Sequence, residues 1–427
     1  MKSSSLAAGV RPREVWAWAF YDFANSGYTT VVITAVFNAY FVAVVAGGAP
    51  WATFAWTASL AASYALIVLS APVIGAYVDA RVAKKRLLLF TTAGCVVFTA
   101  GLALVGRGDL ALGVALVILS NFFFGSGENL IAAFLPEIAH GEAMGKVSGW
   151  GWSLGYFGGL VALGASLAYV SYAQAQGATA TEFVPVAMLI TAALFAIASL
   201  PAFIFLRERA QPVAGAAYRV RSAFARVAET LSHARRHVDL WRFLGCVVFY
   251  QAGIQTVVAL AAVYAQEVMG FTTRDTLTLI LVVNVTAAAG AFSFGYVQDR
   301  IGHVRTLVFT LIGWLIAVVL ACMAEGVTTF WVVANLVGLC LGSSQSAGRA
   351  LVGYLSPPAR SAEFFGLWGF AVKLSAILGP VTYGLVTWIT HGDHRLAMLV
   401  TGVFFVIGIG LLAGLDVARG RRAALYE

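Results

Sequence analysis

Apolar runs of about 20 residues recur along almost the whole chain, and this is the length that an α-helix needs to cross a bilayer. Only 11% of the residues are charged, whereas a soluble domain carries about 25%. The runs are continuous rather than alternating, which disfavours a membrane β-barrel. We therefore expect an all-α membrane protein with twelve transmembrane helices, at residues 16–45, 53–78, 87–105, 110–135, 147–173, 184–206, 240–267, 276–297, 306–324, 329–355, 364–389 and 395–418.

The distribution of basic residues predicts how these helices are oriented. If both termini are cytoplasmic, the cytoplasmic segments contain 22 of the 27 Lys and Arg residues, and the opposite side contains only Arg107, Arg274 and Arg395. This asymmetry follows the positive-inside rule, so we expect both termini to be cytoplasmic. Topology also accounts for the net charge of +8, and we expect no nucleic-acid partner.

A short basic loop between two apolar runs occurs twice, at matching places in the two halves of the chain. Gly75 precedes Asp79 as Gly295 precedes Asp299, and 220 residues separate the two aspartates. Internal duplication of this kind is typical of transporters. We expect two pseudo-symmetric six-helix bundles, at residues 1–206 and 240–427. The basic segment 207–239 is expected to be a cytoplasmic linker that forms an amphipathic helix on lipid headgroups, with a regulatory or partner-binding role as the alternative.

Further motifs correspond between the halves and extend to a known family. The segment FYD at 20–22 parallels FYQ at 249–251, and GSGE at 125–128 parallels GSSQ at 342–345. Together with the repeated loop, these features resemble the major facilitator superfamily. Three segments resemble its vacuole-effluxer-like branch more narrowly: WAFYDFANSG at 18–27, GWSLGYFGG at 151–159 and AEFFGL at 362–367. The resemblance implies a twelve-helix transporter, with amino acids as the substrate class that the fungal autophagy-related members suggest.

Four charged residues fall inside predicted helices, where each costs about 2.5–3.5 kcal/mol if it is left unpaired in lipid. Asp22 and Glu128 lie in the N-terminal half of the chain, and Arg349 and Lys373 lie in the C-terminal half. All four must therefore face the protein interior or a water-filled cavity. We hypothesise that the acids meet the bases across this cavity when it faces outward and separate when it opens inward. Protonation of an acid would weaken the pairs and so couple them to protons.

Two alternatives to this hypothesis use the same four residues. One is a permanent salt-bridge network that only joins the halves. The other is direct binding of a zwitterionic substrate, whose carboxylate would be held by Arg349 and whose amine would be held by one of the acids.

Polar residues at helical spacing predict which helix faces line the cavity. Asp22, Asn25 and Ser26 share one face of the first helix, and comparable stripes follow the fourth, seventh and tenth helices. The resemblance implies that these four helices surround the central cavity. Aromatic residues with a hydroxyl group suit the wall of a small-molecule pocket. The predicted substrate and coupling residues are therefore the four charges together with Tyr21, Asn25, Ser26, Tyr28, Asn121, Tyr250, Gln251, Gln255 and Gln345.

The two repeated loops have a different predicted role. The glycine of each loop lets helix backbones pack closely, and the aspartate is expected to cap the N-terminus of a helix across the seam between the halves. The resemblance implies that this arrangement is a conformational latch rather than a substrate site. We expect the basic residues of the run 81–86 to face the cytoplasm, where they can pair with Asp79. The predicted latch residues are Gly75, Asp79, Arg81, Gly295, Asp299 and Arg300.

Several classes of function are disfavoured because their motifs are missing from the sequence. No P-loop, dinucleotide fingerprint or serine-nucleophile motif occurs, which disfavours an ATP-driven pump. We expect no cofactor and no metal, because Glu137, His140 and Glu142 are better explained as a solvated loop than as a metal site. His303 is likewise expected on the solvated surface, and Trp152 is expected to serve packing.

These observations predict a secondary active transporter that moves a small polar metabolite, amino acids above all, by alternating access. We expect proton coupling and a monomer in the bacterial inner membrane, with a small-molecule substrate, H⁺ and membrane lipids as partners, and export is suggested. The alternative is a broad-specificity proton-antiport exporter of amphipathic or cationic compounds. A membrane-embedded enzyme acting on lipid-linked substrates would need a nucleophile or metal cluster at one membrane face, and a scaffold would not need four polar stripes.

Overall fold

The computed structural model describes residues 6–139, 141–209, 237–271 and 273–426. Twelve helical spans in these ranges are long and apolar enough to cross a membrane, which confirms the predicted number. Residues 210–236 of the predicted amphipathic linker lie outside the described part of the chain.

The first half of the chain contributes six of these spans. The first span is interrupted by two π-helical segments, Thr29–Ala35 and Phe41–Val45. The helices of this half are α1 (Pro12–Tyr28), α2 (Phe37–Tyr40), α3 (Ala52–Arg81), α4 (Lys84–Gly101), α5 (Leu110–Ala132), α6 (Leu135–Ile138), α7 (Met144–Ala175) and α8 (Ala180–Phe205).

The second half contributes the other six spans and a short amphipathic helix at the C-terminal end of the described chain. The helices of this half are α10 (Val238–Glu267), α11 (Thr273–Ile301), α12 (His303–Met323), α13 (Val327–Leu355), α14 (Ser361–Ile389), α15 (His394–Ala413) and α16 (Val417–Leu425).

Local sequence explains where two of the helices at the site begin and end. Pro12 opens α1, where a missing N–H removes no helical hydrogen bond, and Glu14 accepts a hydrogen bond from the Arg11 backbone N–H at 3.1 Å. α3 ends at Arg81, and the next residue, Val82, has a φ of 50° in the left-handed region. This turn lets α4 start at Lys84, so the connection after Asp79, which lies in the last turn of α3, is short.

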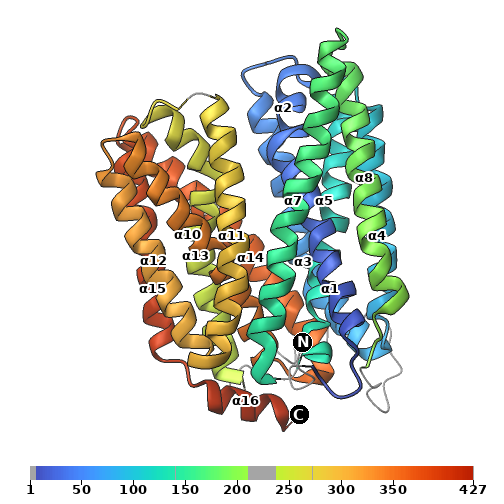
Figure 1. Ribbon diagram of the computed structural model, residues 1–427, viewed down its shortest axis with the longest axis vertical. Helices are drawn as coiled ribbons and strands as arrows, with labels where there is room; N and C mark the ends of the chain where they lie inside the picture. The colour runs from blue at the N-terminus through green and yellow to red at the C-terminus, as the bar shows by residue number, and fades with distance from the viewer. Residues whose placement is uncertain (1–5, 140, 210–236, 272, 427) are drawn as a thin grey trace.

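The two halves are joined most closely at one end of the molecule (Figure 1). α3 packs against α14 and α7 packs against α11. Both termini lie at this end, and the ribbons of the two halves diverge toward the opposite end. Because the basic residues assign the side of the termini to the cytoplasm, we call this the cytoplasmic end. The functional site therefore belongs to a conformation in which the halves meet on the cytoplasmic side.

Candidate functional site

Two of the ion pairs that connect the described parts of the halves lie well inside the helical spans. Arg349 Nη1 lies 2.7 Å from Asp22 Oδ2, and Lys373 Nζ lies 3.3 Å from Glu128 Oε2. In each pair the acid belongs to the first half of the chain and the base to the second half. The sequence left open which acid would meet which base, and the structure assigns Asp22 to Arg349 and Glu128 to Lys373.

The Arg349 side chain is enclosed by groups from the first half, and we call this enclosure the Arg349 socket. Its Nε donates to Ser148 Oγ at 3.1 Å and its Nη2 donates to the Ser148 carbonyl at 2.9 Å. Its guanidinium carbon lies 4.6 Å from the ring centroid of Trp18 and 5.2 Å from that of Trp152. With Asp22 on Nη1 and only 3% of the side chain exposed, Arg349 is not free to hold a substrate carboxylate in this conformation.

Gly151 of α7 explains how the guanidinium can reach the socket. A Cβ added at this position would lie 2.7 Å from Arg349 Nη2 and 2.6 Å from the Trp18 ring, and it would also meet the Asp22 carboxylate. Any larger residue would therefore displace the ion pair. A small residue at a helix interface permits this kind of close approach.

The Glu128–Lys373 pair has a more open environment that includes two aromatic rings. Lys373 Nζ lies 5.3 Å from the ring centroid of Tyr64 and 5.9 Å from that of Phe124. The Glu128 side chain is 28% exposed and that of Lys373 is 12% exposed. Both rings and the carboxylate belong to the first half, and the ammonium belongs to the second half. Because the two partners face each other across the halves, their exposed surface borders the space between the bundles.

The two pairs lie at different depths. Arg349 is six residues from the cytoplasmic end of α13, or about 9 Å at the helical rise. Lys373 is twelve residues from the cytoplasmic end of α14, or about 18 Å by the same rise. Lys373 therefore lies farther from the cytoplasmic end than Arg349. The side chains of the Glu128–Lys373 pair are also the more exposed of the two pairs.

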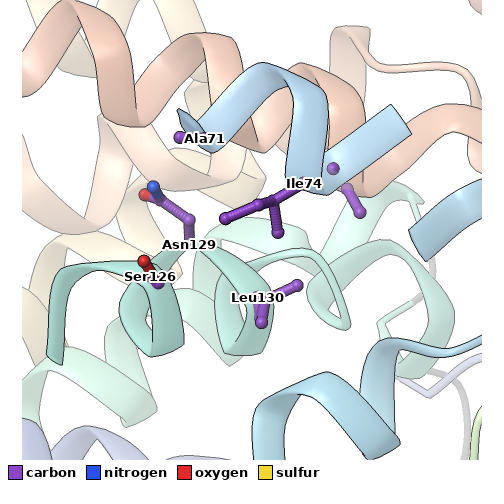
Figure 2. Close-up of a pocket in the computed structure, with 7 residues that line it drawn as sticks. Ala71, Ile74, Ser126, Asn129 and Leu130 are labelled. Carbon is purple, nitrogen blue, oxygen red and sulfur yellow. The ribbon is translucent and has the colours of Figure 1, made fainter. Parts of the chain in front are cut away.

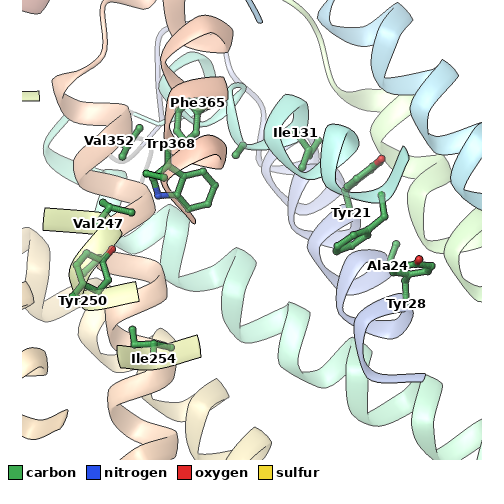
Figure 3. Packing of buried hydrophobic residues seen from close by; sticks show 14 of the residues in the cluster. Tyr21, Ala24, Tyr28, Ile131, Val247, Tyr250, Ile254, Val352, Phe365 and Trp368 are labelled. Carbon is green, nitrogen blue, oxygen red and sulfur yellow. The ribbon is translucent and has the colours of Figure 1, made fainter. Parts of the chain in front are cut away.

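Three tyrosines that were expected to form a cavity wall lie instead inside the bundles. Tyr21 Oη is 2.6 Å from Thr92 Oγ1, and Tyr28 Oη is 2.9 Å from Ser120 Oγ, so both pair within their own half. Tyr250 is also buried, and Figure 3 shows each of the three among packed apolar side chains. A buried phenol needs a polar partner, and for Tyr21 and Tyr28 a neighbouring helix supplies it. Tyr21 and Tyr28 therefore brace the first bundle in this conformation, whereas Tyr250 Oη has no hydrogen-bond partner among the described residues. A role of the three tyrosines in substrate contact stays a prediction.

Polar residues of the predicted stripes also pair inside their own half. Asn121 Nδ2 donates to Ser63 Oγ at 2.9 Å, and Gln251 Nε2 donates to Gln345 Oε1 at 2.8 Å. These contacts orient the side chains between neighbouring helices, and a role in substrate contact stays a prediction. The remaining stripe residues are the buried Asn25 and the half-buried Ser26 and Gln255.

The first repeated loop joins α3 to α14 in a contact that we call the first seam. Asp79 accepts hydrogen bonds from the backbone N–H groups of Ala362 at 3.1 Å and Glu363 at 2.8 Å. Its carboxylate therefore caps the N-terminus of a helix in the other half, where the helix dipole favours an anion. A Cβ at Gly75 would lie 2.7 Å from the Glu363 Cα. The expected capping geometry is present, and its role as a latch stays a prediction.

Lys84 pairs with Asp79 as expected, but it lies inside the first seam and does not face the cytoplasm. Its side chain is fully buried, and its Nζ is 2.6 Å from Glu137 Oε1, 2.6 Å from Ser361 Oγ and 3.5 Å from Asp79 Oδ1. The two carboxylates explain the burial, because each would otherwise be an unpaired charge in the seam. Glu137 is accordingly a buried partner and not part of a solvated loop. The neighbouring Arg81 is exposed.

A small cavity adjoins the first seam, between α3, α5 and α14 (Figure 2). Its volume is about 10 Å³, and Ser126 and Asn129 contribute its polar lining. Ser126 Oγ and Asn129 Nδ2 are buried and have no hydrogen-bond partner among the described residues. A polar cavity of this size suits a single water molecule.

The second repeated loop joins α11 to α7 in the second seam. Both carboxylate oxygens of Asp299 lie 3.3 Å from the Lys146 backbone nitrogen, and Lys146 Nζ is 3.8 Å from Oδ2. A Cβ at Gly295 would lie 2.8 Å from the Gly145 carbonyl oxygen. Arg300, the other predicted latch residue here, is exposed. Asp299 thus caps α7 as Asp79 caps α14.

Sequence reasoning missed the aromatic and hydroxyl parts of the Arg349 socket. A signal was available, because Trp18 and Asp22 are four residues apart, as are Ser148 and Trp152, so each pair shares one helix face. Tyr64 carries no comparable signal.

His303 also differs from its expected place on the solvated surface. It is buried at the start of α12, where Tyr354 covers its ring at a centroid distance of 4.8 Å. Its Nδ1 lies 2.8 Å from Gln298 Nε2.

Comparison with known proteins identifies the family of this chain. The family model described as "Vacuole effluxer Atg22 like" matches residues 52–425. The chain belongs to this family. This Atg22-like chain has relatives in bacteria and in fungi. It is 27% identical over 408 residues to the uncharacterized MFS-type transporter YxiO of Bacillus subtilis, a match that covers 93% of both chains.

The fungal relatives of this Atg22-like chain are longer. Autophagy-related protein 22 of Yarrowia lipolytica is 24% identical over 346 residues, which are 73% of this chain and 57% of the relative. The Kluyveromyces lactis protein is 28% identical over 208 residues, which are 46% of this chain and 42% of the relative. The chain thus spans about half the length of the fungal relatives that it matches.

Solved structures show that the fold is that of the major facilitator superfamily. The human organic anion transporter MFSD10 has a TM-score of 0.72 at 15% identity, and the alignment covers 94% of this chain and 100% of that chain. The E. coli fucose:proton symporter FucP has a TM-score of 0.71 at 14% identity, and a FucP structure in the outward conformation has a TM-score of 0.74 at 13% identity. These two alignments each cover 95% of this chain and 98% of that chain. The chain thus combines membership of the Atg22-like effluxer family with the twelve-span fold of this superfamily.

Proposed function

We propose that this Atg22-like transporter exports a small polar metabolite, amino acids above all, by alternating access coupled to protons. The observation that carries the proposal is the pair of ion bridges between the halves, one enclosed and one partly exposed. The bundles 1–206 and 240–427 move as two bodies joined by the segment 207–239. The protein acts as a monomer in the bacterial plasma membrane and performs no enzymatic reaction.

The two pairs have separate tasks in this proposal. The Arg349 socket closes the path to the cytoplasm, because five contacts from α1 and α7 hold a side chain of α13. Glu128 and Lys373 face the substrate. Since Arg349 is fully engaged, Lys373 is the base that holds the carboxylate of a zwitterion.

Protonation of the acids supplies the coupling. A neutral Asp22 loses its Coulomb attraction for Arg349, so the socket opens more easily and the halves separate at the cytoplasmic end. A neutral Glu128 releases Lys373 in the same way. The fucose neighbour is named as a proton symporter, which supports protons as the coupling ion for this fold.

Transport by purified protein in liposomes tests the proposal. We expect a pH gradient to drive accumulation of a labelled amino acid, and we expect Arg349→Ala to lose at least 90% of it. Glu128→Gln should keep exchange of internal for external substrate but lose the response to the gradient. Lys85→Met is the matched control, because Lys85 bonds to the Leu206 carbonyl and not to either pair. Uptake that is insensitive to pH in the wild type and in Glu128→Gln would contradict proton coupling.

A second candidate function is favoured by the aromatic rings beside Glu128. A carboxylate flanked by Tyr64 and Phe124 suits an amphipathic cation, which supports the broad-specificity exporter. Efflux of a cationic dye from the same liposomes, with no exchange of any amino acid, would favour this candidate.

A further inference from the structure

The surroundings of the Lys373 ammonium form a cation site built entirely by the first half. Glu128 Oε2 lies 3.3 Å from Nζ, and the ring centroids of Tyr64 and Phe124 lie 5.3 Å and 5.9 Å away. A carboxylate with two aromatic faces is the usual composition of a site that recognises an organic ammonium group. We call these three residues the ammonium site.

One ring of the ammonium site is held in place independently of Lys373. Phe124 stacks on Tyr28 with a centroid distance of 4.7 Å, and the Tyr28 hydroxyl is 2.9 Å from Ser120 Oγ. These contacts lie within the first half. The ring therefore keeps its position when the lysine leaves, and part of the site is formed in advance.

Lys373 is held more weakly than Lys84, which also contacts the opposite half. Lys84 is fully buried and contacts Asp79, Glu137 and Ser361. Among the described residues, Lys373 donates one hydrogen bond, to a carboxylate that is 28% exposed. Because the Glu128–Lys373 pair is partly exposed, replacing Lys373 by a competing cation should cost less than breaking the fully buried contacts of Lys84.

We propose that the ammonium site binds an organic ammonium ligand and that Lys373 is a built-in occupant which the ligand displaces. The inference rests on the proposed function, because it takes Glu128 and Lys373 to lie on the transport path. Displacement frees the lysine from the first half and removes one bridge between the bundles. Ligand binding and the release of a contact between the halves thereby become a single exchange. When the ligand is a zwitterion, the freed Lys373 binds its carboxylate.

Removal of the built-in occupant tests this inference. Tetramethylammonium is the probe, and its affinity is measured by isothermal titration of purified protein in detergent. We expect Lys373→Met to bind the probe at least tenfold more tightly than wild type, because the site is then empty. Lys373→Arg keeps a cationic occupant and should bind as weakly as wild type. Lys373→Met combined with Glu128→Gln should lose the gain.

A second comparison covers the case in which Lys373→Met does not fold. Tyr64→Leu in the wild-type background removes one ring and should weaken tetramethylammonium binding about three- to tenfold, while Phe122→Leu, on the same helix as Glu128 but outside the site, should not. Equal affinity in folded wild type and Lys373→Met overturns the inference, as does an unchanged affinity in Tyr64→Leu. Failure of amino-acid transport in liposomes would sink the proposed function and leave these binding results standing, so the two failures are distinguishable.

Discussion

The charged side chains of the first seam are more completely buried than those of the second, although both seams are built on the same Gly-xxx-Asp motif. Lys84, the cation of the first seam, is fully buried and 2.6 Å from Glu137, whereas Lys146 of the second seam is 23% exposed and 3.8 Å from Asp299. Asp79 is fully buried and Asp299 is 10% exposed. The difference shows that a duplicated motif can keep its geometry while its electrostatic environment diverges.

The difference in burial determines how much free energy is expected to be lost when a charged residue of either seam is removed. Breaking a buried ion pair costs about 3–5 kcal/mol, whereas an exposed pair contributes about 0–1 kcal/mol. The Lys84 pairs lie within the first half and hold Asp79 and Lys84 in the positions from which they contact α14, so we expect their loss to weaken the first seam more than loss of the Lys146–Asp299 pair weakens the second. A reporter can compare them: Ser346→Cys places a thiol at a buried position that contacts Ser148 of the other half. Its labelling by a maleimide from the cytoplasmic side, corrected for the native cysteines, follows opening of that end.

The largest effect is expected for Asp79→Ala. The substitution removes two caps on α14 and leaves Lys84 with one carboxylate fewer. A loss of about 3 kcal/mol for a broken buried pair corresponds to roughly 100-fold more of the opened state. Reporter labelling should accelerate by that order. Labelling at the wild-type rate, in protein that elutes as wild type, would show that the cap does not hold the seam.

Lys84→Met is expected to have the next largest effect. Asp79 keeps both backbone hydrogen bonds, but it and Glu137, which both belong to the first half, lose their shared cation, and the contact of that cation with Ser361 of the second half is lost as well. We expect a loss of about 2 kcal/mol, close to 30-fold faster labelling, because the retained caps offset part of the cost of a buried unpaired charge. Lys85→Met is the control, since Lys85 bonds to the Leu206 carbonyl. Equal rates in the two variants would refute the role of Lys84.

Gly75→Ala tests packing in the first seam without changing a charge. The added Cβ would lie 2.7 Å from the Glu363 Cα and would meet the Ala362 carbonyl. Both are backbone atoms, so a side-chain rotation cannot relieve the clash. Overpacking of this kind costs about 1–3 kcal/mol. We expect labelling about tenfold faster than wild type and faster than in Gly295→Ala. Gly164→Ala is the control, because nothing lies within 4 Å of a Cβ there.

The sequence was sufficient for the fold and for part of the site, and the reason differs from residue to residue. Hydropathy and basic loops predict twelve spans because a bilayer constrains every span in the same way. The signs of Asp22 and Arg349 predict a bridge between halves because unpaired charges are too costly in lipid.

Other features depend on tertiary contacts that no local pattern records. The basic run 81–86 has the composition of a solvent-exposed loop. Lys84 is nevertheless buried, because Glu137 and Ser361 contact its ammonium group. Tyr28 was expected in the cavity wall because it combines a ring with a hydroxyl group, yet its hydroxyl meets Ser120 inside its own bundle.

The smallest effect is expected for Asp299→Ala, which tests the second seam. The carboxylate accepts from the Lys146 backbone at 3.3 Å and faces an ammonium at 3.8 Å that water also reaches. Water can replace part of both interactions, so we expect a loss of about 1 kcal/mol and labelling about fivefold faster than wild type. Asp79→Ala measured in parallel is the reference. Equal acceleration in the two variants would mean that burial of Lys84 adds nothing, and the seams would then be energetically equivalent. A fivefold effect beside a hundredfold one would show that the two copies of the motif have diverged in strength while both still cap a helix of the opposite half.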